Sequence, residues 1–208
     1  MNTNARDFDT IAREVFAPIY PVIARQILEH TGISEGRCLD VGCGTGYLGL
    51  AVAEQSDLEL TFYDQSEYML AITRENIAAR GMEERSCILQ GDVARIPMQD
   101  NSANLAVSRG SLFFWTRPDL AFAEVHRILT PGGKAVLGGG FGSAALKEQV
   151  SRQMEAREGQ PGQWRAKVGN NLSEQTVRKY EKALREAMIP DYEINLNDEA
   201  GLWITISK

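Results

Sequence analysis

A glycine-rich segment near the start of the chain has the residue types best suited to binding a nucleoside. It reads Leu-Asp-Val-Gly-Cys-Gly-Thr-Gly-Tyr-Leu-Gly-Leu over residues 39–50. A strand that ends and turns on glycine lets a ligand touch the backbone, because no Cβ is in the way. Free N–H groups at the following helix start attract electron-rich atoms. The spacing Gly44-x-Gly46-x-x-Gly49 also satisfies the dinucleotide fingerprint, so this segment alone does not separate one nucleoside ligand from another.

Three acidic residues at the ends of three successive predicted strands narrow the choice of nucleoside ligand. Asp40 immediately precedes the glycine turn, Asp64 closes the second strand and Asp92 follows the third. A carboxylate before the turn would repel a pyrophosphate but suits an ammonium and a sulfonium. Asp64 stands where a carboxylate takes both hydroxyls of a ribose, and Asp92 where one accepts from an adenine amino group. Together these acids favour a cationic adenosine over a dinucleotide.

Short apolar strands alternate with helices along most of the chain. Strands are expected over 38–41, 58–63, 87–90, 105–108 and 134–137, with helices over 47–55 and 67–80 and from Pro118 to before Pro131. This alternation predicts right-handed crossovers and a mostly parallel sheet covered on both faces. Two final strands, 192–196 and 202–207, are separated by a short turn, which predicts an antiparallel hairpin at the sheet edge. The expected fold is α/β, a Rossmann-like three-layer sandwich whose mostly parallel seven-stranded sheet has a reversed C-terminal hairpin strand.

Composition and charge exclude several classes of protein. The chain has 208 residues, of which 43% are hydrophobic, and its 22 Lys and Arg against 28 Asp and Glu give a net charge of −6. This balance disfavours a nucleic-acid partner, because such binding depends on clustered Lys and Arg. No apolar run reaches the length of about 18 residues that a membrane helix needs, and the polar start lacks a secretory signal. With two histidines and no acids at ligand spacing, no metal site is expected.

The three cysteines and two histidines are expected to be structural or solvent-exposed rather than catalytic. Cys38 and Cys87 are expected in strand cores, and Cys43 as a small filler in the turn. An odd number of cysteines within apolar segments favours a reduced, cytoplasmic setting. His30 and His126 are expected on solvated helix surfaces.

The sequence resembles class I S-adenosylmethionine-dependent methyltransferases of the small-molecule type, similar to the ubiquinone-biosynthesis methylase group. The matching residues are 39–46, Asp64, Gly91-Asp92 and 124–133. The resemblance implies S-adenosyl-L-methionine as cofactor and S-adenosyl-L-homocysteine as product. It also implies direct displacement of the methyl group onto a small-molecule acceptor, driven by positioning and desolvation.

The resemblance also assigns roles to individual residues. Asp40 and the backbone of Gly42, Cys43, Gly44 and Gly46 would hold the methionine part. Asp64 and Gln65 would belong to the ribose end, and Asp92 with the Val93 backbone to the adenine. Ser108 and Arg109, which end the fourth strand, would lie beside the methionine amino group and the transferred methyl. Both are expected to be catalytic, with Ser108 also counted among the cofactor-binding residues.

The family's usual His or acid after the fourth strand is missing. Phe113, Phe114 and Trp115 stand there instead, either as core packing or as pocket wall. We hypothesise a site without a general base, whose acceptor is already nucleophilic or is deprotonated by the field of Arg109. Two other functions stay open: a non-catalytic nucleoside-binding protein and an NAD-linked oxidoreductase. The latter calls for a Tyr-x-x-x-Lys or a His/acid pair, and neither occurs in a convincing place.

One methyltransferase domain is expected over residues 1–208. Its parts are an N-terminal helical cap over 1–30, a cofactor-binding core over 38–140, a helical cap or insert over 141–190 and a closing hairpin over 191–208. Within 141–190, helices over 143–158 and 173–188 flank a predicted polar loop that contains Pro161, Gly162, Trp164 and Gly169. Tyr20, Trp164, Arg165 and Lys167 are candidates to close over the site. Oligomeric state is not predicted.

Overall fold

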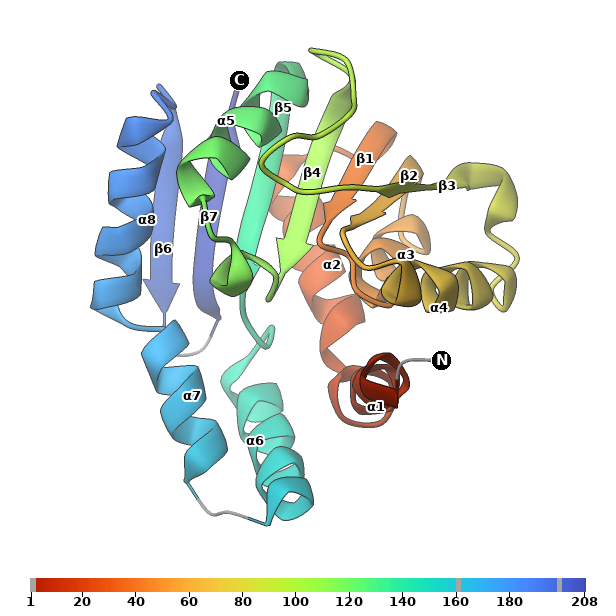
Figure 1. Ribbon diagram of the computed structural model, residues 1–208, viewed down its shortest axis with the longest axis vertical. Coiled ribbons are helices and arrows are strands. Elements are labelled where there is room, and N and C mark those ends of the chain that lie inside the picture. The colour runs from red at the N-terminus through yellow and green to blue at the C-terminus, as the bar shows by residue number, and fades with distance from the viewer. Residues whose placement is uncertain (1–2, 160–161, 198–199) are drawn as a thin grey trace.

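The computed structural model describes residues 3–159, 162–197 and 200–208. Over these residues, a seven-stranded sheet with the order β3-β2-β1-β4-β5-β7-β6 forms the middle layer (Figure 1). The strands are β1 Glu35–Val41, β2 Asp57–Asp64, β3 Ser86–Gln90, β4 Ala103–Arg109, β5 Leu129–Gly139, β6 Tyr192–Asn197 and β7 Gly201–Ser207. The pairs from β3 to β5 are parallel, and the hairpin of β6 and β7 joins β5 through an antiparallel pair. The predicted fold class is confirmed.

Helices cover both faces of this sheet. They are α1 Thr3–Ile11, η1 Ala12–Phe16, α2 Ile19–Thr31, α3 Tyr47–Ala53, α4 Glu67–Ala78, η2 Glu83–Arg85, η3 Leu112–Phe114, α5 Pro118–Ile128, α6 Ala144–Glu158, α7 Gln163–Asn171 and α8 Glu174–Glu186. Helices α2 and α3 pack on one face, and α5 and α8 lie together on the other. In Figure 1, α1, α6 and α7 lie below the edge to which β4 points. This edge is formed by the carboxyl ends of the parallel strands.

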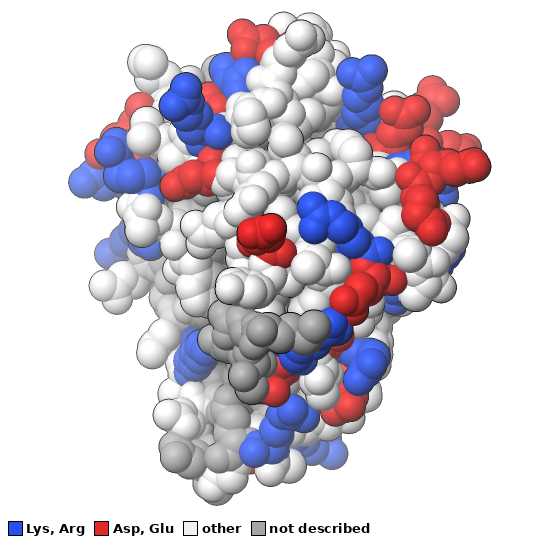
Figure 2. Space-filling view, turned by 45° about the vertical axis from the view of Figure 1, so that its right-hand side comes forward, with Lys and Arg blue, Asp and Glu red and all other residues white. Residues whose placement is uncertain are grey.

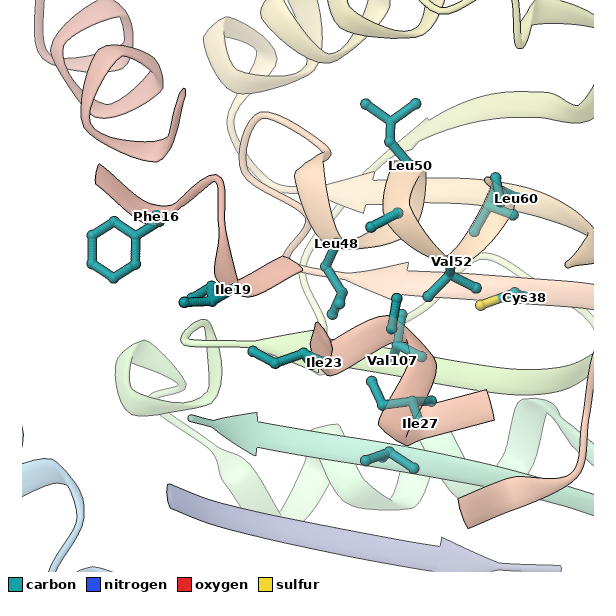
Figure 3. Close-up of a cluster of buried hydrophobic side chains, with 14 of the residues drawn as sticks. Phe16, Ile19, Ile23, Ile27, Cys38, Leu48, Leu50, Val52, Leu60 and Val107 are labelled. Atoms are coloured by element: carbon teal, nitrogen blue, oxygen red, sulfur yellow. The ribbon is translucent and has the colours of Figure 1, made fainter. Parts of the chain in front are cut away.

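Two apolar clusters hold the layers together. On one face, Ile19, Ile23, Leu48 and Val52 meet Leu60 of the sheet (Figure 3). On the other face, the sheet packs against a cluster that includes Phe122, Val125, Tyr180 and Leu184. Neighbouring strand residues divide between the clusters: Leu105 and Val107 belong to the first, and Ala103 and Ala106 to the second. A strand buried on both faces is apolar at nearly every position, so these strands appear in the sequence as continuous apolar runs.

The predicted polar loop after α6 is wrong in part, because residues 163–171 form helix α7. Gly162 begins this helix with a φ of 81°, and Pro161 lies outside the described residues. Arg165 ties α7 to α6 through Glu148 and Glu155, with Arg165 Nη1 2.8 Å from Glu148 Oε2. Val168 is the side chain that α7 buries. Helix α7 thus packs through few apolar side chains, Val168 with the partly buried Trp164, and is linked to α6 by exposed ion pairs.

The N-terminal segment forms two helices joined by the π-helical turn η1. Pro18 caps α2 and Pro21 lies in its first turn, where the missing N–H has no helical partner. Pro21 is therefore accommodated within α2 without breaking it. Within the described residues, no helix combines the length and apolar character needed to cross a bilayer.

The predictions for one cysteine and one histidine need correction. Cys38 is buried as expected, but Cys87 is exposed, with Sγ 3.0 Å from Thr61 Oγ1. His126 is half-buried rather than solvated, and its Nε2 has no hydrogen-bond partner among the described residues. Burial lowers the pKa of this imidazole. His30 is exposed as predicted, with Nε2 3.2 Å from Thr205 Oγ1.

Candidate active site

A cavity of about 670 Å³ lies at the carboxyl ends of the parallel strands. This volume is within the range of about 300–1,000 Å³ that is usual for ligand pockets. The lining comes from α1 to α2, the glycine turn, the ends of β1, β2 and β4, the segments after β3 and β5, and α6 to α7. Of the predicted site residues, those that line it are Asp40, Gly42, Cys43, Gly44, Asp64, Gln65, Asp92, Val93 and Arg109.

The glycine turn uses a backbone conformation that L side chains rarely adopt. Gly42, Gly44 and Gly46 have φ values of 65°, 56° and 87°. The Cys43 N–H donates to the Tyr63 carbonyl at 3.0 Å, which fastens the turn to β2. A Cβ on Gly42 would overlap Ser111. Glycine is therefore required both by conformation and by space. Gly46 supports the turn without lining the cavity.

Asp40 lies on the floor of the cavity and is buried. Its Oδ2 accepts a hydrogen bond from the Gly49 N–H at 2.9 Å. Burial raises the pKa of this carboxyl to about 7, although the Gly49 bond acts in the opposite direction. No Lys, Arg or His forms an ion pair with Asp40 in the described part of the chain. A positive ligand group here would favour the ionised form.

Asp64 connects two backbone segments at the site through hydrogen bonds. Its Oδ2 accepts from the Gly44 N–H and its Oδ1 from the Ser66 N–H, each at 2.9 Å. Burial raises the pKa of this carboxyl, against the effect of these backbone donors. The carboxylate thus joins the glycine turn to the start of α4, in addition to any contact with a ligand.

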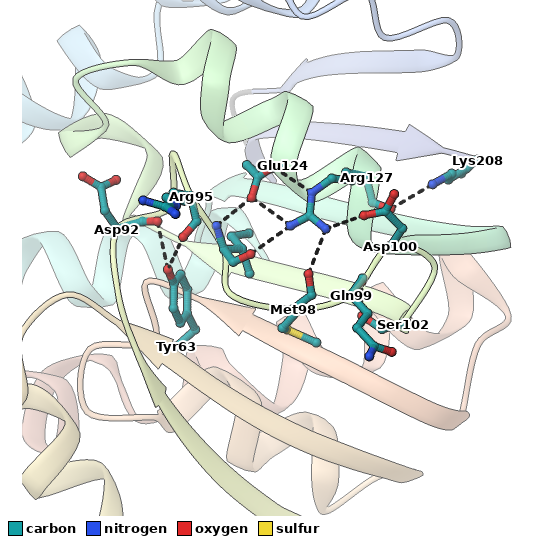
Figure 4. Close-up of polar contacts among 11 residues, drawn as sticks. Tyr63, Asp92, Arg95, Met98, Gln99, Asp100, Ser102, Glu124, Arg127 and Lys208 are labelled. Atoms are coloured by element: carbon teal, nitrogen blue, oxygen red, sulfur yellow. Dashed lines mark hydrogen bonds and ion pairs between the residues drawn. The ribbon is translucent and has the colours of Figure 1, made fainter.

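The loop after β3 brings Asp92 to the cavity. The Tyr63 hydroxyl donates a hydrogen bond to the Asp92 carbonyl at 2.8 Å (Figure 4). Asp92 Oδ1 accepts from the Ala94 N–H at 2.9 Å. Further along the loop, Arg127 donates to the carbonyls of Ile96 and Met98, each at 2.8 Å. The loop is therefore held at both ends, which fixes the position of the Asp92 backbone.

Arg109 enters the cavity among aromatic rings. Its guanidinium carbon lies 4.8 Å from the ring centroid of Phe16, 5.6 Å from that of Phe141 and 5.8 Å from that of Tyr20. These are cation–π distances. Its Nε donates to the Gly140 carbonyl at 2.9 Å. Burial lowers the pKa of the guanidinium.

The side chain of Ser108 does not line the cavity. It is fully buried. Its Oγ lies 2.6 Å from Ser111 Oγ, and Ser111 donates to the Val41 carbonyl at 3.0 Å. The structure therefore brings Arg109 to the site but not the Ser108 hydroxyl.

The consecutive aromatic residues 113–115 contribute both to core packing and to the cavity wall, the two roles expected for them. All three line the cavity. Trp115 is 8% exposed and packs edge-on against Phe122 at a centroid distance of 5.7 Å, whereas Phe114 is 77% exposed. Phe113 is half-buried, and a Cβ on Gly139 would overlap its ring. The stretch thus joins the core to the cavity wall.

The sequence reasoning missed several lining residues from other segments. They are Phe8, Phe16, Tyr47, Met154 and Asn171. The apolar spacing in the N-terminal helix marks Phe8 and Phe16 as one face of a helix, but it does not say what this face covers.

Charges on the face seen in Figure 2 are mixed in sign. Figure 2 shows Lys and Arg interspersed with Asp and Glu on the visible face, with acidic side chains gathered near its right edge and no continuous basic area. Among the described residues, no group of three or more His, Cys, Asp or Glu is arranged to hold a metal ion.

Comparisons with known proteins identify the family of the chain. A family model described as a methyltransferase domain matches residues 39–137. A crystal structure from Methanococcus maripaludis, assigned as an S-adenosyl-L-methionine-dependent methyltransferase, is 44% identical with a TM-score of 0.93. That match covers 98% of this chain and 91% of the other.

Curated relatives match the core of the chain. The ubiquinone/menaquinone biosynthesis C-methyltransferase UbiE of Cupriavidus necator is 33% identical over 113 residues, which is 53% of this chain and 46% of that protein. The chloroplastic 2-methyl-6-phytyl-1,4-hydroquinone methyltransferase 1 of Oryza sativa subsp. japonica is 34% identical over 111 residues, or 53% and 32%. This chain thus matches less than half the length of either relative. Because the match to the Methanococcus protein extends over nearly all of both chains, the protein belongs to the class I S-adenosyl-L-methionine-dependent methyltransferases.

Proposed function

We propose that the protein transfers a methyl group from S-adenosyl-L-methionine to a small-molecule acceptor by direct displacement. The observation that carries this proposal is the buried Asp40 carboxyl, which lies without a counter-charge beneath a glycine turn in a cavity of about 670 Å³. A cationic nucleoside offsets the cost of that buried carboxylate, and a pyrophosphate increases it.

The residues around the turn fit this cofactor. Asp40, with the backbone of the turn, holds the methionine part, and Asp64 with Gln65 holds the ribose. Asp92 and the Val93 backbone hold the adenine. When bound, the cofactor supplies an electrophilic methyl group on a sulfonium. The chain keeps the methionine end fixed and leaves the aromatic part of the cavity for the acceptor.

The chemistry then depends on positioning and desolvation. Phe16, Tyr20 and Phe141 line the half of the cavity that contains Arg109, and no histidine is among the lining residues. Excluding water while the reacting atoms are held in line supplies much of the acceleration of a displacement. We therefore expect kcat, measured at saturating cofactor, to follow the ionisation of the acceptor. A dependence on an enzyme carboxylate or imidazole contradicts the absence of a general base.

The acceptor is a small molecule. Relatives include a C-methyltransferase of ubiquinone/menaquinone biosynthesis and a malonyl-[acyl-carrier protein] O-methyltransferase from Methylococcus capsulatus, the latter 35% identical over 123 residues. Their acceptor atoms differ, as expected of a fold in which the acceptor pocket varies between members.

The test is a screen with cofactor carrying an isotopically labelled methyl group. The protein is incubated with a metabolite extract, and labelled compounds are identified by mass spectrometry. Transfer to a metabolite by the wild-type protein but not by Asp40→Ala supports the proposal. If the protein binds S-adenosyl-L-homocysteine but labels no compound, a non-catalytic nucleoside-binding protein is the better reading.

We also propose a cytoplasmic location. Cys38, Cys43 and Cys87 are all free thiols in the structure, a state typical of reducing compartments.

A further inference from the structure

The acidic and basic side chains that line the cavity come from different parts of the sheet. The acids Asp40, Asp64 and Asp92 come from β1, β2 and the loop after β3, whereas Arg109 comes from β4. In the sheet order β3-β2-β1-β4-β5, the three acids therefore all lie to one side of Arg109. A second cation, Lys167 of α7, also lines the cavity and forms no ion pair with a described residue.

Arg109 lacks a carboxylate partner within the described part of the chain. Its Nε donates to the Gly140 carbonyl, and no described residue accepts a hydrogen bond from Nη1 or Nη2. The other arginine of the cavity is different, because Arg117 Nε and Nη2 reach the two oxygens of Asp119 at 3.0 and 2.7 Å. Arg109 is half-buried, so its guanidinium loses part of its hydration without gaining a counter-charge, and a ligand anion offsets that loss.

The surroundings of Arg109 suit a planar anion. Phe16 of η1, Tyr20 of α2 and Phe141 after β5 come from three segments and converge on one guanidinium. These rings and the Gly140 carbonyl limit its movement. A planar guanidinium fork with two free amino groups matches the two oxygens of a carboxylate.

We propose that Arg109, within the cage of Phe16, Tyr20 and Phe141, is a carboxylate-binding site of the cavity. This inference rests on the proposed function and adds a requirement to it: one ligand must place a carboxylate against β4. That carboxylate has two possible sources, a methyl acceptor that is itself a carboxylic acid and the amino-acid end of the cofactor.

Calorimetry with three proteins distinguishes the sources. The wild type, Arg109→Gln and the control Arg117→Gln are titrated with S-adenosyl-L-homocysteine and with 5′-methylthioadenosine, which lacks the amino-acid end. If the cofactor supplies the carboxylate, Arg109→Gln weakens the first ligand about tenfold or more and leaves the second unchanged. Arg117→Gln affects neither, because Asp119 already neutralises Arg117.

An acceptor carboxylate gives a different pattern. Arg109→Gln then keeps the wild-type affinity for both nucleosides. Benzoate, titrated into both the ligand-free and the S-adenosyl-L-homocysteine-saturated protein, binds the wild type more tightly than the uncharged benzamide does. In Arg109→Gln this preference for benzoate disappears.

The proposal is overturned if Arg109→Gln binds both nucleosides like the wild type and benzoate binds the wild type no better than benzamide. Failure of the wild type to bind S-adenosyl-L-homocysteine contradicts the proposed function instead, and the benzoate titration of the ligand-free protein then decides the Arg109 site alone. The benzoate and benzamide comparison needs no variant, so it remains decisive if Arg109→Gln does not fold. Arg109→Lys keeps the charge without the fork and is expected to lose most of the preference.

Discussion

Asp40 makes cofactor binding depend on pH. Because burial raises the pKa of its carboxyl to about 7, the side chain of the ligand-free protein gains a proton as the pH falls through 7. The protonated carboxyl cannot balance a positive ligand, so affinity falls toward acid pH. The affinity for S-adenosyl-L-homocysteine should drop about tenfold between pH 8 and pH 6.

Isothermal titration calorimetry at the two pH values tests this expectation, with Asp40→Asn as the control. Asparagine still accepts from the Gly49 N–H, but it does not ionise, so its weaker binding should be independent of pH. An unchanged wild-type affinity contradicts the assignment of Asp40. In the ligand-free protein, the same raised pKa adds stability as pH falls from about 7 toward about 4, because the folded state then binds the proton more tightly than the unfolded chain.

Asp64 has a structural and a binding role that a pair of variants separates. Asp64→Ala removes the acceptors for the Gly44 and Ser66 N–H groups and the proposed ribose contacts. We expect its affinity for S-adenosyl-L-homocysteine to fall about tenfold or more. Asp64→Asn retains one acceptor oxygen and should unfold at a temperature closer to the wild type, while still binding more weakly. Full affinity in Asp64→Ala contradicts the ribose assignment.

For individual residues, the sequence predicts which side chains stand at the ends of strands. It does not predict which of two adjacent residues faces the ligand. Asp40, Asp64 and Asp92 follow apolar strands, so the sheet itself brings them to one edge. Ser108 and Arg109 are adjacent on β4, and successive side chains point to opposite faces. Only one of the two reaches the cavity, and the sequence does not say which.

We expect a glycine-to-alanine change to lower the free energy of unfolding in α3 and to raise it in α7. A Cβ on Gly49 in α3 would lie 2.5 Å from Phe62 Cε1 and 2.8 Å from Asp40 Oδ2, whereas a Cβ on Gly169 in α7 meets nothing within 4 Å. Gly49→Ala should therefore reduce the free energy of unfolding by about 1–3 kcal/mol through overpacking. Gly169→Ala should raise it by about 0.5–1 kcal/mol, because alanine is the better helix former.

Chemical denaturation of both variants measures the two changes. Because Asp40 contacts the same Gly49, Gly49→Ala should also weaken cofactor binding, and Gly169→Ala should not. Equal destabilisation by both substitutions contradicts the close packing of α3 on β1 and β2.

The elements that the sequence predicts correctly are those whose burial dictates their pattern. The strands of the parallel sheet are buried on both faces and appear as apolar runs. Helix α7 instead buries Val168 alone among its side chains, and Arg165 pairs with Glu148 and Glu155 of α6. Ion pairs between helices depend on tertiary placement, which local composition does not report.

For the molecule as a whole, the order of strands was predictable in outline, and the shape of the acceptor side was not. Alternation of strands and helices implies parallel crossovers, and the short final turn implies the reversed hairpin. The half of the cavity around Arg109 is assembled from η1, α2, α7 and the segment after β5. These segments are far apart in the sequence and share no periodicity that predicts their convergence.

Ligand-induced stabilisation tests the assembly of the site, because the cavity draws on segments from Phe8 to Leu172. A ligand at 100 times its dissociation constant adds about 2.7 kcal/mol to the free energy of unfolding. For a chain of this size, that raises the melting temperature by about 5–10 °C. S-adenosyl-L-methionine and S-adenosyl-L-homocysteine should both produce this shift, whereas NAD should produce none at the same concentration, because its pyrophosphate would lie against Asp40. Stabilisation by NAD alone would contradict this assignment, since a diphosphate at the glycine turn would be repelled by an ionised Asp40.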